Sequence, residues 1–466
     1  MTHMNSGVIE DFKSRLRGQL LQPNDTGYDE ARQIWNAMID KRPAMIVRCA
    51  GAADVMAAVA FARDHDLQLA VKGGGHNIAG NALCEDGLVI DLSAMRSVRI
   101  DREAKRAYVE GGALLRDVDH ETQAFGMATP LGINSTTGVG GLTLGGGFGW
   151  LSRKHGLTVD NLVSADVITA DGRFLHTTAG ENPDLYWALR GGGGNFGVVT
   201  CFEFQLHEVG PQVTAGLIVF PFDQAKQVLT RYRDLVTSLR DDVNIWAVLR
   251  KAPPLPFLPV DVHGKEVVVM AFFSALDLEA VRSELDTVRG FGQACGEHAG
   301  AMPYAAWQQV FDPLLTHGAR NYWKSHNFTG LSDEAIDTVL RYAGSLPSPQ
   351  CEIFLGLLGG QSNRVAPDAT AYPHRKALYA MNVHARWEDV SEDQKCIDWA
   401  RAFFTATTPY ASGSVYINFL TEDEGNRIAD AYGGNYARLK DIKAKYDSRN
   451  LFRQNQNIHP SVPLVN

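Results

Sequence analysis

The sequence has neither the surplus of positive charge nor the long apolar runs that would direct it to nucleic acid or to a membrane. Its 44 Lys and Arg residues are outnumbered by 53 Asp and Glu residues, which gives a formal net charge of -9. A mildly acidic protein has no electrostatic attraction to nucleic acid or to anionic lipid. No stretch offers the ~20 consecutive apolar residues of a membrane span, and residues 1–21 are too polar for a signal peptide. We therefore expect no nucleic-acid or membrane partner and a cytoplasmic location.

Several catalytic and metal-binding signatures are also missing. The six cysteines are scattered without a CxxC pair, which argues against a disulfide framework or a zinc site. The chain contains no HExxH, no GxxxxGK[ST] and no GxSxG segment. We therefore expect buried free thiols and no metal, and we exclude P-loop nucleotide chemistry.

Glycine, in contrast, is abundant and clustered. Of the 45 glycines, many fall in three groups, at residues 73–75, 138–149 and 191–197. Glycine lets backbone N–H groups approach a phosphate closely, so three such groups suggest one large anionic ligand held by several loops, although tight turns alone would also use glycine. The GxGxxG match at residues 192–197 precedes a predicted strand instead of opening a helix, so it lacks the context of a Rossmann dinucleotide site.

The pattern of apolar residues predicts an α+β protein. A strand–helix–strand unit precedes the first glycine group, and the Asp171–Gly172 turn predicts a β-hairpin. Residues 212–415 alternate strands with amphipathic helices, which indicates one sizeable sheet. The proline-rich residues 252–260 are expected to form a surface loop. Predicted helices are residues 25–42, one beginning at Asp54, and residues 223–239, 278–291 and 333–343.

Four segments together resemble a known family. They read VKGGGHN with VIDLS, TTGVGGLTLGGGFGW, DLYWALRGGGGNFG and, near the end, YARLKDIKAKYDSRNLFRQNQNI. In this order they resemble the berberine bridge enzyme-like branch of the vanillyl-alcohol oxidase superfamily. The resemblance implies a two-part FAD-binding domain of the p-cresol methylhydroxylase type and a substrate domain with a large antiparallel sheet flanked by helices. Implied boundaries are residues 1–210 for the FAD-binding domain, 211–418 for the substrate domain, and 419–466 for a C-terminal segment that returns to the FAD-binding domain.

The same resemblance implies how FAD is held. His76 would bond covalently to the 8α carbon of the flavin. Many family members form a second bond from a cysteine, but here Asn134 occupies that position, so we expect a single link and no cysteinyl bond. The other residues expected to bind the cofactor are Lys72, Gly73, Gly74, Gly75, Asn77, Thr136, Thr137, Gly138, Gly140, Gly141, Gly145, Phe148, Gly197, Val198, Asn455 and Asn457.

Three residues are candidates for catalysis. Tyr416, on a predicted VYINF strand, would act as a base or activate the substrate hydroxyl, and as a base it would need a depressed pKa. Asn382 stands where the family carries a catalytic Glu or Gln, and an amide can hydrogen-bond substrate but cannot take its proton. His384, two residues on and therefore on the same strand face, is an alternative base. Phe148 and Phe419 replace tyrosines of the family, so the pocket should be more apolar than in carbohydrate oxidases.

These features predict an FAD-dependent oxidase of a small organic alcohol such as a sugar, an aromatic alcohol or a secondary metabolite. The partners would be the substrate and molecular oxygen, with hydrogen peroxide as a product. Thr137, at the position that lines a small oxygen pocket in plant members, favours use of oxygen. A dehydrogenase that passes electrons to a quinone and a non-catalytic flavin-binding protein remain alternatives.

Overall fold

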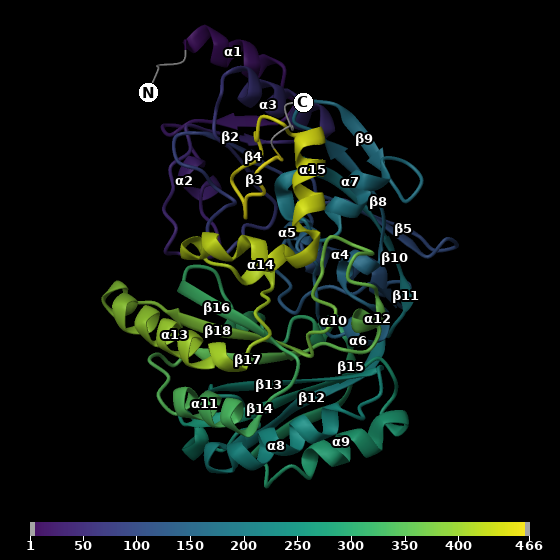
Figure 1. The fold of residues 1–466 in the computed structure, drawn as a ribbon, viewed down its shortest axis with the longest axis vertical. Coiled ribbons are helices and arrows are strands. Elements are labelled where there is room, and N and C mark those ends of the chain that lie inside the picture. Colours follow the sequence, from purple (N-terminus) through teal and green to yellow (C-terminus); the bar gives the residue numbers. More distant parts are fainter. Residues whose placement is uncertain (1–4, 462–466) are drawn as a thin grey trace.

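The computed structural model describes residues 5–461 and contains three principal β-sheets (Figure 1). Two smaller sheets lie in the upper half of the view, and a seven-stranded sheet lies in the lower half. The α+β class and the large antiparallel sheet are therefore confirmed.

The first small sheet contains the strand that leads to His76. Its order is β1-β2-β4-β3, and β2, β4 and β3 run parallel, with β1 antiparallel at one edge. Helix α3 connects β2 to β3, as the strand–helix–strand pattern predicted. The strands are β1 (Gln19–Leu21), β2 (Met45–Arg48), β3 (Leu69–Lys72) and β4 (Leu88–Asp91).

The second small sheet is antiparallel, with the order β5-β6-β10-β8-β9. Strands β8 and β9 form the predicted hairpin, and Gly172 in its turn has a φ of +83°. A separate two-stranded ladder joins β7 to β11. The strands are β5 (Val98–Asp101), β6 (Arg106–Glu110), β7 (Met127–Ala128), β8 (Leu162–Ile168), β9 (Phe174–Thr177), β10 (Val198–Gln205) and β11 (His207–Glu208).

The large sheet has the order β15-β12-β14-β13-β17-β18-β16, and all neighbouring strands are antiparallel. Its strands are β12 (Gln212–Pro221), β13 (Val243–Lys251), β14 (Glu266–Ser274), β15 (Gly296–Pro303), β16 (Arg320–Phe328), β17 (Glu352–Leu357) and β18 (Tyr379–Trp387). Helices α8, α11 and α13 pack on one face (Figure 1). The helices of the chain are α1 (Ser6–Ser14), α2 (Tyr28–Ala31), α3 (Ala52–Asp64), α4 (Leu115–Gln123), α5 (Val139–Leu144), α6 (Ser152–His155), α7 (Pro183–Leu189), α8 (Ala225–Val236), α9 (Arg282–Arg289), α10 (Tyr304–Trp307), α11 (Asp333–Ala343), α12 (Gln361–Arg364), α13 (Asp393–Thr407), α14 (Ile428–Tyr432) and α15 (Tyr436–Tyr446).

Alternation along β18 divides its side chains between the helices and a cavity. Met381, Val383 and Ala385 belong to the main hydrophobic core, whereas Asn382 and His384 line the cavity on the other face. The expectation that Asn382 and His384 share one strand face is therefore confirmed.

The C-terminal segment returns from the large sheet to the smaller ones. In Figure 1 helix α15 lies beside α7 in the upper half, and these two helices contact each other. Lys443 of α15 donates to the backbone oxygen of Asn195 at 2.7 Å, which ties the segment to the third glycine group. The C-terminal segment thus packs against the third glycine group, from which it is far removed in the sequence.

Two local predictions are wrong. Of the helix expected over residues 25–42, only α2 forms, because the later part makes tertiary bonds instead: the backbone N–H of Trp35 donates to Gly75, and the Asn36 side chain donates to Ile78 and Asn321. The VYINF segment is not a strand but a single 3-10 turn over Ile417–Phe419. Both departures bring side chains to the cavity.

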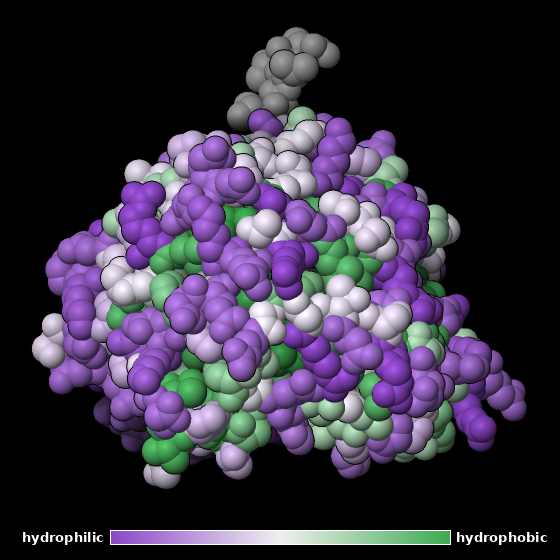
Figure 2. Space-filling view, turned by 90° about the horizontal axis from the view of Figure 1, so that it is seen from below, coloured by the Kyte–Doolittle hydropathy of each residue, from purple (hydrophilic) through white to green (hydrophobic). Residues whose placement is uncertain are grey.

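The face seen from below in Figure 2 is mostly hydrophilic, with apolar residues scattered between charged ones. Within residues 5–461, no helix combines the length and apolar character that crossing a bilayer requires. All six cysteines are free: Cys201 and Cys295 are half-buried, and the other four are buried.

Candidate active site

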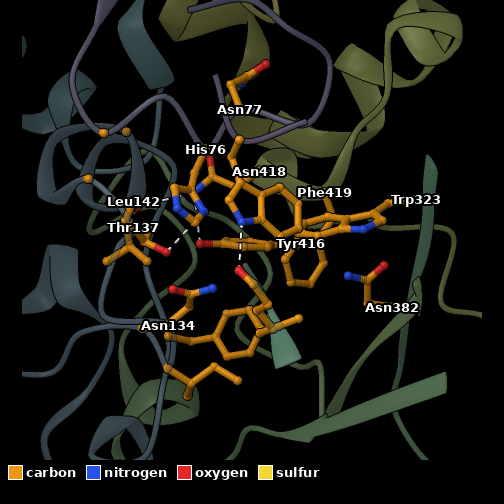
Figure 3. Close-up of a pocket in the computed structure, with 18 of the residues that line it drawn as sticks. His76, Asn77, Asn134, Thr137, Leu142, Trp323, Asn382, Tyr416, Asn418 and Phe419 are labelled. Carbon is orange, nitrogen blue, oxygen red and sulfur yellow. Dashed lines mark hydrogen bonds between the residues drawn. The ribbon is translucent and has the colours of Figure 1, made fainter. Parts of the chain in front are cut away.

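A cavity of about 370 Å³ lies between the glycine loops and the face of the large sheet opposite the helices. Its lining comes from all three glycine groups, the C-terminal residues 452–456, the turn at 416–419 and several sheet strands. In Figure 3, His76, Thr137 and Asn134 lie at the left and Trp323 and Asn382 at the right, with Tyr416 and Asn418 between them. The site is thus built from two unlike walls.

The wall on the loop side consists largely of backbone. A Cβ atom on Gly74 would lie 2.3 Å from the nitrogen of Gly138, and one on Gly138 would lie 2.4 Å from the nitrogen of Gly74. Any side chain at either position would therefore push the first and second glycine groups apart. Gly75 adopts a φ of +69°, which turns the chain so that His76 reaches the cavity.

His76 is held by aromatic and hydroxyl contacts. The Trp35 ring stacks on the imidazole with ring centroids 5.1 Å apart, and His317 packs edge-on at 5.6 Å. Its Nε2 lies 2.9 Å from the hydroxyl oxygen of Thr136, and its Nδ1 lies 3.5 Å from that of Thr137. Burial, with smaller effects of His317 and Arg386, lowers the pKa of His76 to about 3. The ring is therefore neutral at physiological pH, which leaves one nitrogen as a nucleophile.

Most of the predicted cofactor residues line the cavity, but four do not. Lys72 donates to the backbone oxygen of Ala31 at 2.6 Å and lies 3.7 Å from Asp91. Its ammonium therefore binds other parts of the protein and does not line the cavity. Thr136 reaches the site only through His76. Gly145 packs against Asn418, and a Cβ there would lie 2.2 Å from the amide oxygen. Asn457 has a buried side-chain oxygen with no partner among the described residues, but it too lies outside the lining. The predicted residues that do line it are Gly73, Gly74, Gly75, His76, Asn77, Thr137, Gly138, Gly140, Gly141, Phe148, Gly197, Val198 and Asn455.

The wall on the sheet side consists of side chains. The Asn382 side-chain oxygen is buried and has no hydrogen-bond partner among residues 5–461. A buried polar atom without a partner is costly, and because Asn382 lines the cavity, a molecule bound there can donate a hydrogen bond to it. Phe354 lies opposite Asn382 on the adjacent strand, and Trp246 and Trp323 also line the cavity.

His384 has both ring nitrogens occupied. Nδ1 lies 3.2 Å from a carboxylate oxygen of Glu352, and Nε2 lies 3.2 Å from the side-chain oxygen of Asn321. Burial lowers the pKa of His384 while Glu352 acts in the opposite direction. For Glu352, burial alone would raise the pKa, but Arg250 at 2.8 Å and His384 outweigh it and hold the pKa at about 2. The imidazole therefore has no free nitrogen for direct contact with substrate, and a proton from substrate can reach it only by way of a neighbouring group.

Tyr416 lacks the charged neighbour that a phenolic base needs. Its hydroxyl oxygen accepts from the backbone N–H of Gly147 at 3.1 Å and from the Asn418 amide at 2.9 Å. Burial raises its pKa to about 12, although these two hydrogen bonds lower it slightly. A base role for Tyr416 would need a depressed pKa, and the described residues do not provide one. The phenol keeps its own proton and can donate it in a hydrogen bond.

Sequence reasoning did not identify Trp35, Glu352, Arg250 or Trp323 as site residues. Trp35 lay inside the expected helix, and Glu352 pairs with Arg250 across two adjacent strands whose register no motif specifies. The loop at residues 252–260 was expected only at the surface. Its Pro253, Leu255 and Leu258 line the far end of the cavity, whereas Val260 is 82% exposed.

Comparisons with known proteins agree with this geometry. A family model described as an FAD binding domain matches residues 43–178, and one described as berberine and berberine like matches residues 415–459. Among the residues these models cover are His76, the second glycine group and the turn that carries Tyr416.

Similar proteins extend the likeness over nearly the whole chain. (R)-6-hydroxynicotine oxidase of Paenarthrobacter nicotinovorans is 31% identical, over 96% of this chain and 97% of that protein. An FAD-linked oxidoreductase of Aspergillus terreus is 39% identical, over 94% and 93%. The crystal structure of 6-hydroxy-D-nicotine oxidase from Arthrobacter nicotinovorans superposes with a TM-score of 0.86 at 28% identity, covering 96% of this chain and 98% of that one.

Proposed function

The chain belongs to the berberine bridge enzyme-like family of FAD-linked oxidoreductases, and we propose that it oxidises a small, largely apolar organic alcohol with FAD bound covalently to His76. We assign residues 1–210 and 419–466 to FAD binding and residues 211–418 to substrate binding. Molecular oxygen is the proposed electron acceptor, with hydrogen peroxide as its product.

The residues of the cavity fit FAD. Glycines at the Gly74–Gly138 contact leave backbone N–H groups open to a pyrophosphate, and the Asn455 side-chain oxygen is buried without a partner among the described residues while its amide donates to Gly194 and Phe452. His76 supplies a neutral imidazole for the covalent link. When bound, FAD supplies a two-electron acceptor for hydride.

The observation that carries the substrate proposal is the unpaired oxygen of Asn382 within an apolar wall. An alcohol O–H can donate to this oxygen, and the Tyr416 phenol can donate to the alcohol oxygen. The aromatic and aliphatic side chains of the cavity offer few further polar partners, and Arg250, Glu352 and His384, which also line it, already pair with one another. This balance favours an aromatic or aliphatic alcohol over a sugar, which needs a hydrogen bond for nearly every hydroxyl.

Loss of hydride from the carbon leaves one proton on the alcohol oxygen to be removed. We propose that the Glu352–His384 pair accepts this proton. Neutral His384 has one N–H for two facing oxygens, so a second proton on the ring would satisfy both hydrogen bonds. Substrate contact would come through Glu352, which lines the cavity, and Arg250 would hold the pair in place.

A panel of alcohols tests this proposal. Under anaerobic conditions the bound flavin should be bleached by an aromatic or aliphatic alcohol at least about tenfold faster than by a mono- or disaccharide, since one unmatched polar group costs about 1–3 kcal/mol. Admission of oxygen should restore the yellow colour with release of peroxide. Preference for sugars would overturn the substrate class, and recovery only with a quinone would identify a dehydrogenase. Flavin that no alcohol bleaches would indicate a non-catalytic flavin protein.

A further inference from the structure

The turn at residues 134–136 contains hydrogen bonds that determine which nitrogen of His76 carries its proton. Asn134 occupies the position of the family's flavin-linked cysteine, so no second covalent bond forms there. Its side chain instead bonds to Thr136, which in turn contacts His76. Ser135, between them, is anchored to Asp312, so the turn is fixed at both sides.

The orientation of the Asn134 amide is unambiguous. The backbone N–H of Thr136 lies 3.1 Å from the Asn134 side-chain atom assigned as oxygen. Because a backbone N–H can only donate, the atom facing it must be the carbonyl oxygen and not the amide nitrogen.

The orientation of the Asn134 amide determines the direction of two further hydrogen bonds, both made by the Thr136 hydroxyl. The Thr136 hydroxyl lies 2.7 Å from the same oxygen, which has no hydrogen, so the hydroxyl donates to it. A hydroxyl has one hydrogen, and therefore the Thr136 oxygen can only accept from His76 Nε2 at 2.9 Å. Nε2 carries the proton, and Nδ1 keeps its lone pair.

We infer that Asn134 and Thr136 are positioning residues that set the tautomer of His76 and make Nδ1 the nitrogen that bonds to FAD. This inference rests on the proposed attachment at His76. The low pKa of the buried ring agrees with it, because a neutral imidazole must choose one tautomer. The Thr137 hydroxyl, 3.5 Å from Nδ1, is too distant to occupy that lone pair firmly.

The attachment balances with the flavin itself as oxidant. The Nδ1 lone pair forms the new bond to the 8α carbon, and one C–H bond of that methyl group breaks. Its electron pair reduces the isoalloxazine, and its proton is taken up by the reduced ring. The ring would become an imidazolium, with Nε2 still hydrogen-bonded to Thr136, paired with the anion of the reduced flavin. Reoxidation by oxygen would then give hydrogen peroxide, which takes one proton from the reduced flavin and one from the imidazolium.

The experiment uses purified holoenzyme and three variants. Acid precipitation measures the covalently bound fraction of flavin, and NMR of the isolated flavin peptide identifies the linking nitrogen. We expect only Nδ1 linkage in the wild type and in Thr136→Ser, which keeps the hydroxyl. Thr136→Val and Asn134→Leu should reduce the covalently bound fraction of flavin about fivefold, the equivalent of one neutral hydrogen bond. The two variants should also give a mixture of Nδ1 and Nε2 linkages, because the imidazole ring of His76 can then flip.

The possible outcomes separate the inference about the tautomer of His76 from the proposed attachment of FAD to His76. Wild-type flavin bound through Nε2, or Thr136→Val with the wild-type fraction and pure Nδ1 linkage, would overturn the inference while leaving the attachment to His76 intact. Wild-type flavin that stays in the acid supernatant would overturn the attachment itself. Circular dichroism and the flavin spectrum check that each variant is folded.

Discussion

The two walls of the cavity are built by different means. On the loop side, the glycine groups touch backbone to backbone at Gly74 and Gly138, and glycines from all three groups line the cavity without side chains of their own. On the sheet side, antiparallel strands present side chains such as Asn382, His384 and Glu352. A wall made of backbone can bind a ligand part that all members of a family share, whereas a wall made of side chains can be changed one residue at a time.

The electrostatics of the walls differ in the same way. On the loop side a buried imidazole is kept neutral, while on the sheet side a buried carboxylate is kept charged by Arg250. We propose that the loop wall holds the cofactor and its attachment site, and that the sheet wall determines the substrate. Three substitutions in the walls test this division, and a fourth, Asp119→Asn, tests the effect of burial on a carboxyl group outside the cavity.

Gly74→Ala should disrupt the close backbone contact between the first and second glycine groups. The new methyl group would lie 2.3 Å from the Gly138 nitrogen, so the two loops must separate. We expect at least about a tenfold loss of bound flavin, measured as the ratio of flavin to protein absorbance. Gly434→Ala is the matched control, because a Cβ there meets nothing within 4 Å. Full flavin content in Gly74→Ala would show that the close contact is not needed.

Glu352→Gln should destabilise the sheet wall. It leaves Arg250 without its buried carboxylate, and breaking such a pair costs about 3–5 kcal/mol in unfolding free energy. The folded pKa of Glu352 is lowered, so its contribution is present above its usual pKa of 4.5 and is lost as the pH falls toward 2. Chemical denaturation from pH 3 to pH 7 measures both effects.

The control for Glu352→Gln is Glu266→Gln, on β14 of the same sheet, which β13 separates from β17. Glu266 forms a half-exposed pair with Lys251 at 4.0 Å, for which we expect less than about 1 kcal/mol. Equal losses in the two variants would contradict a special role for the buried pair.

Asp119→Asn should stabilise the protein at alkaline pH. Asp119 of α4 is buried near Gln308, and burial raises its pKa to about 7. Since the folded pKa is raised, the protonated form is favoured, and stability is highest below pH 3.8 and is lost as the pH rises through 7. At pH 8 the variant should gain up to about 4 kcal/mol, and at pH 4 almost nothing. Glu121→Gln, exposed on the same helix, should show no such trend. A gain that does not depend on pH would contradict the assignment.

Asn382→Leu should separate stability from activity. Removal of a buried oxygen without a partner is expected to leave the unfolding free energy unchanged or to raise it by about 1 kcal/mol. The same change should lower kcat/KM for the alcohol about tenfold, because the substrate loses a hydrogen-bond acceptor. A parallel loss of stability and activity would mean that Asn382 is structural.

The sequence allowed the loop wall to be predicted much better than the sheet wall. His76, Gly74 and Gly138 were expected because they lie in segments that resemble a family motif, and the close backbone contact explains why residues 74 and 138 are glycines. Glu352 and Arg250 could not be found, because their pairing depends on strand register set by tertiary packing. The raised pKa of Tyr416 could not be predicted for a related reason: burial, its main cause, is a property of the folded chain.

The most direct test of the account is the mass of the proteolytic peptide that carries His76 from the yellow native protein. We predict that this peptide carries one FAD, and that no peptide containing Asn134 does. An unmodified His76 peptide, with all flavin released by acid, would contradict the central claim.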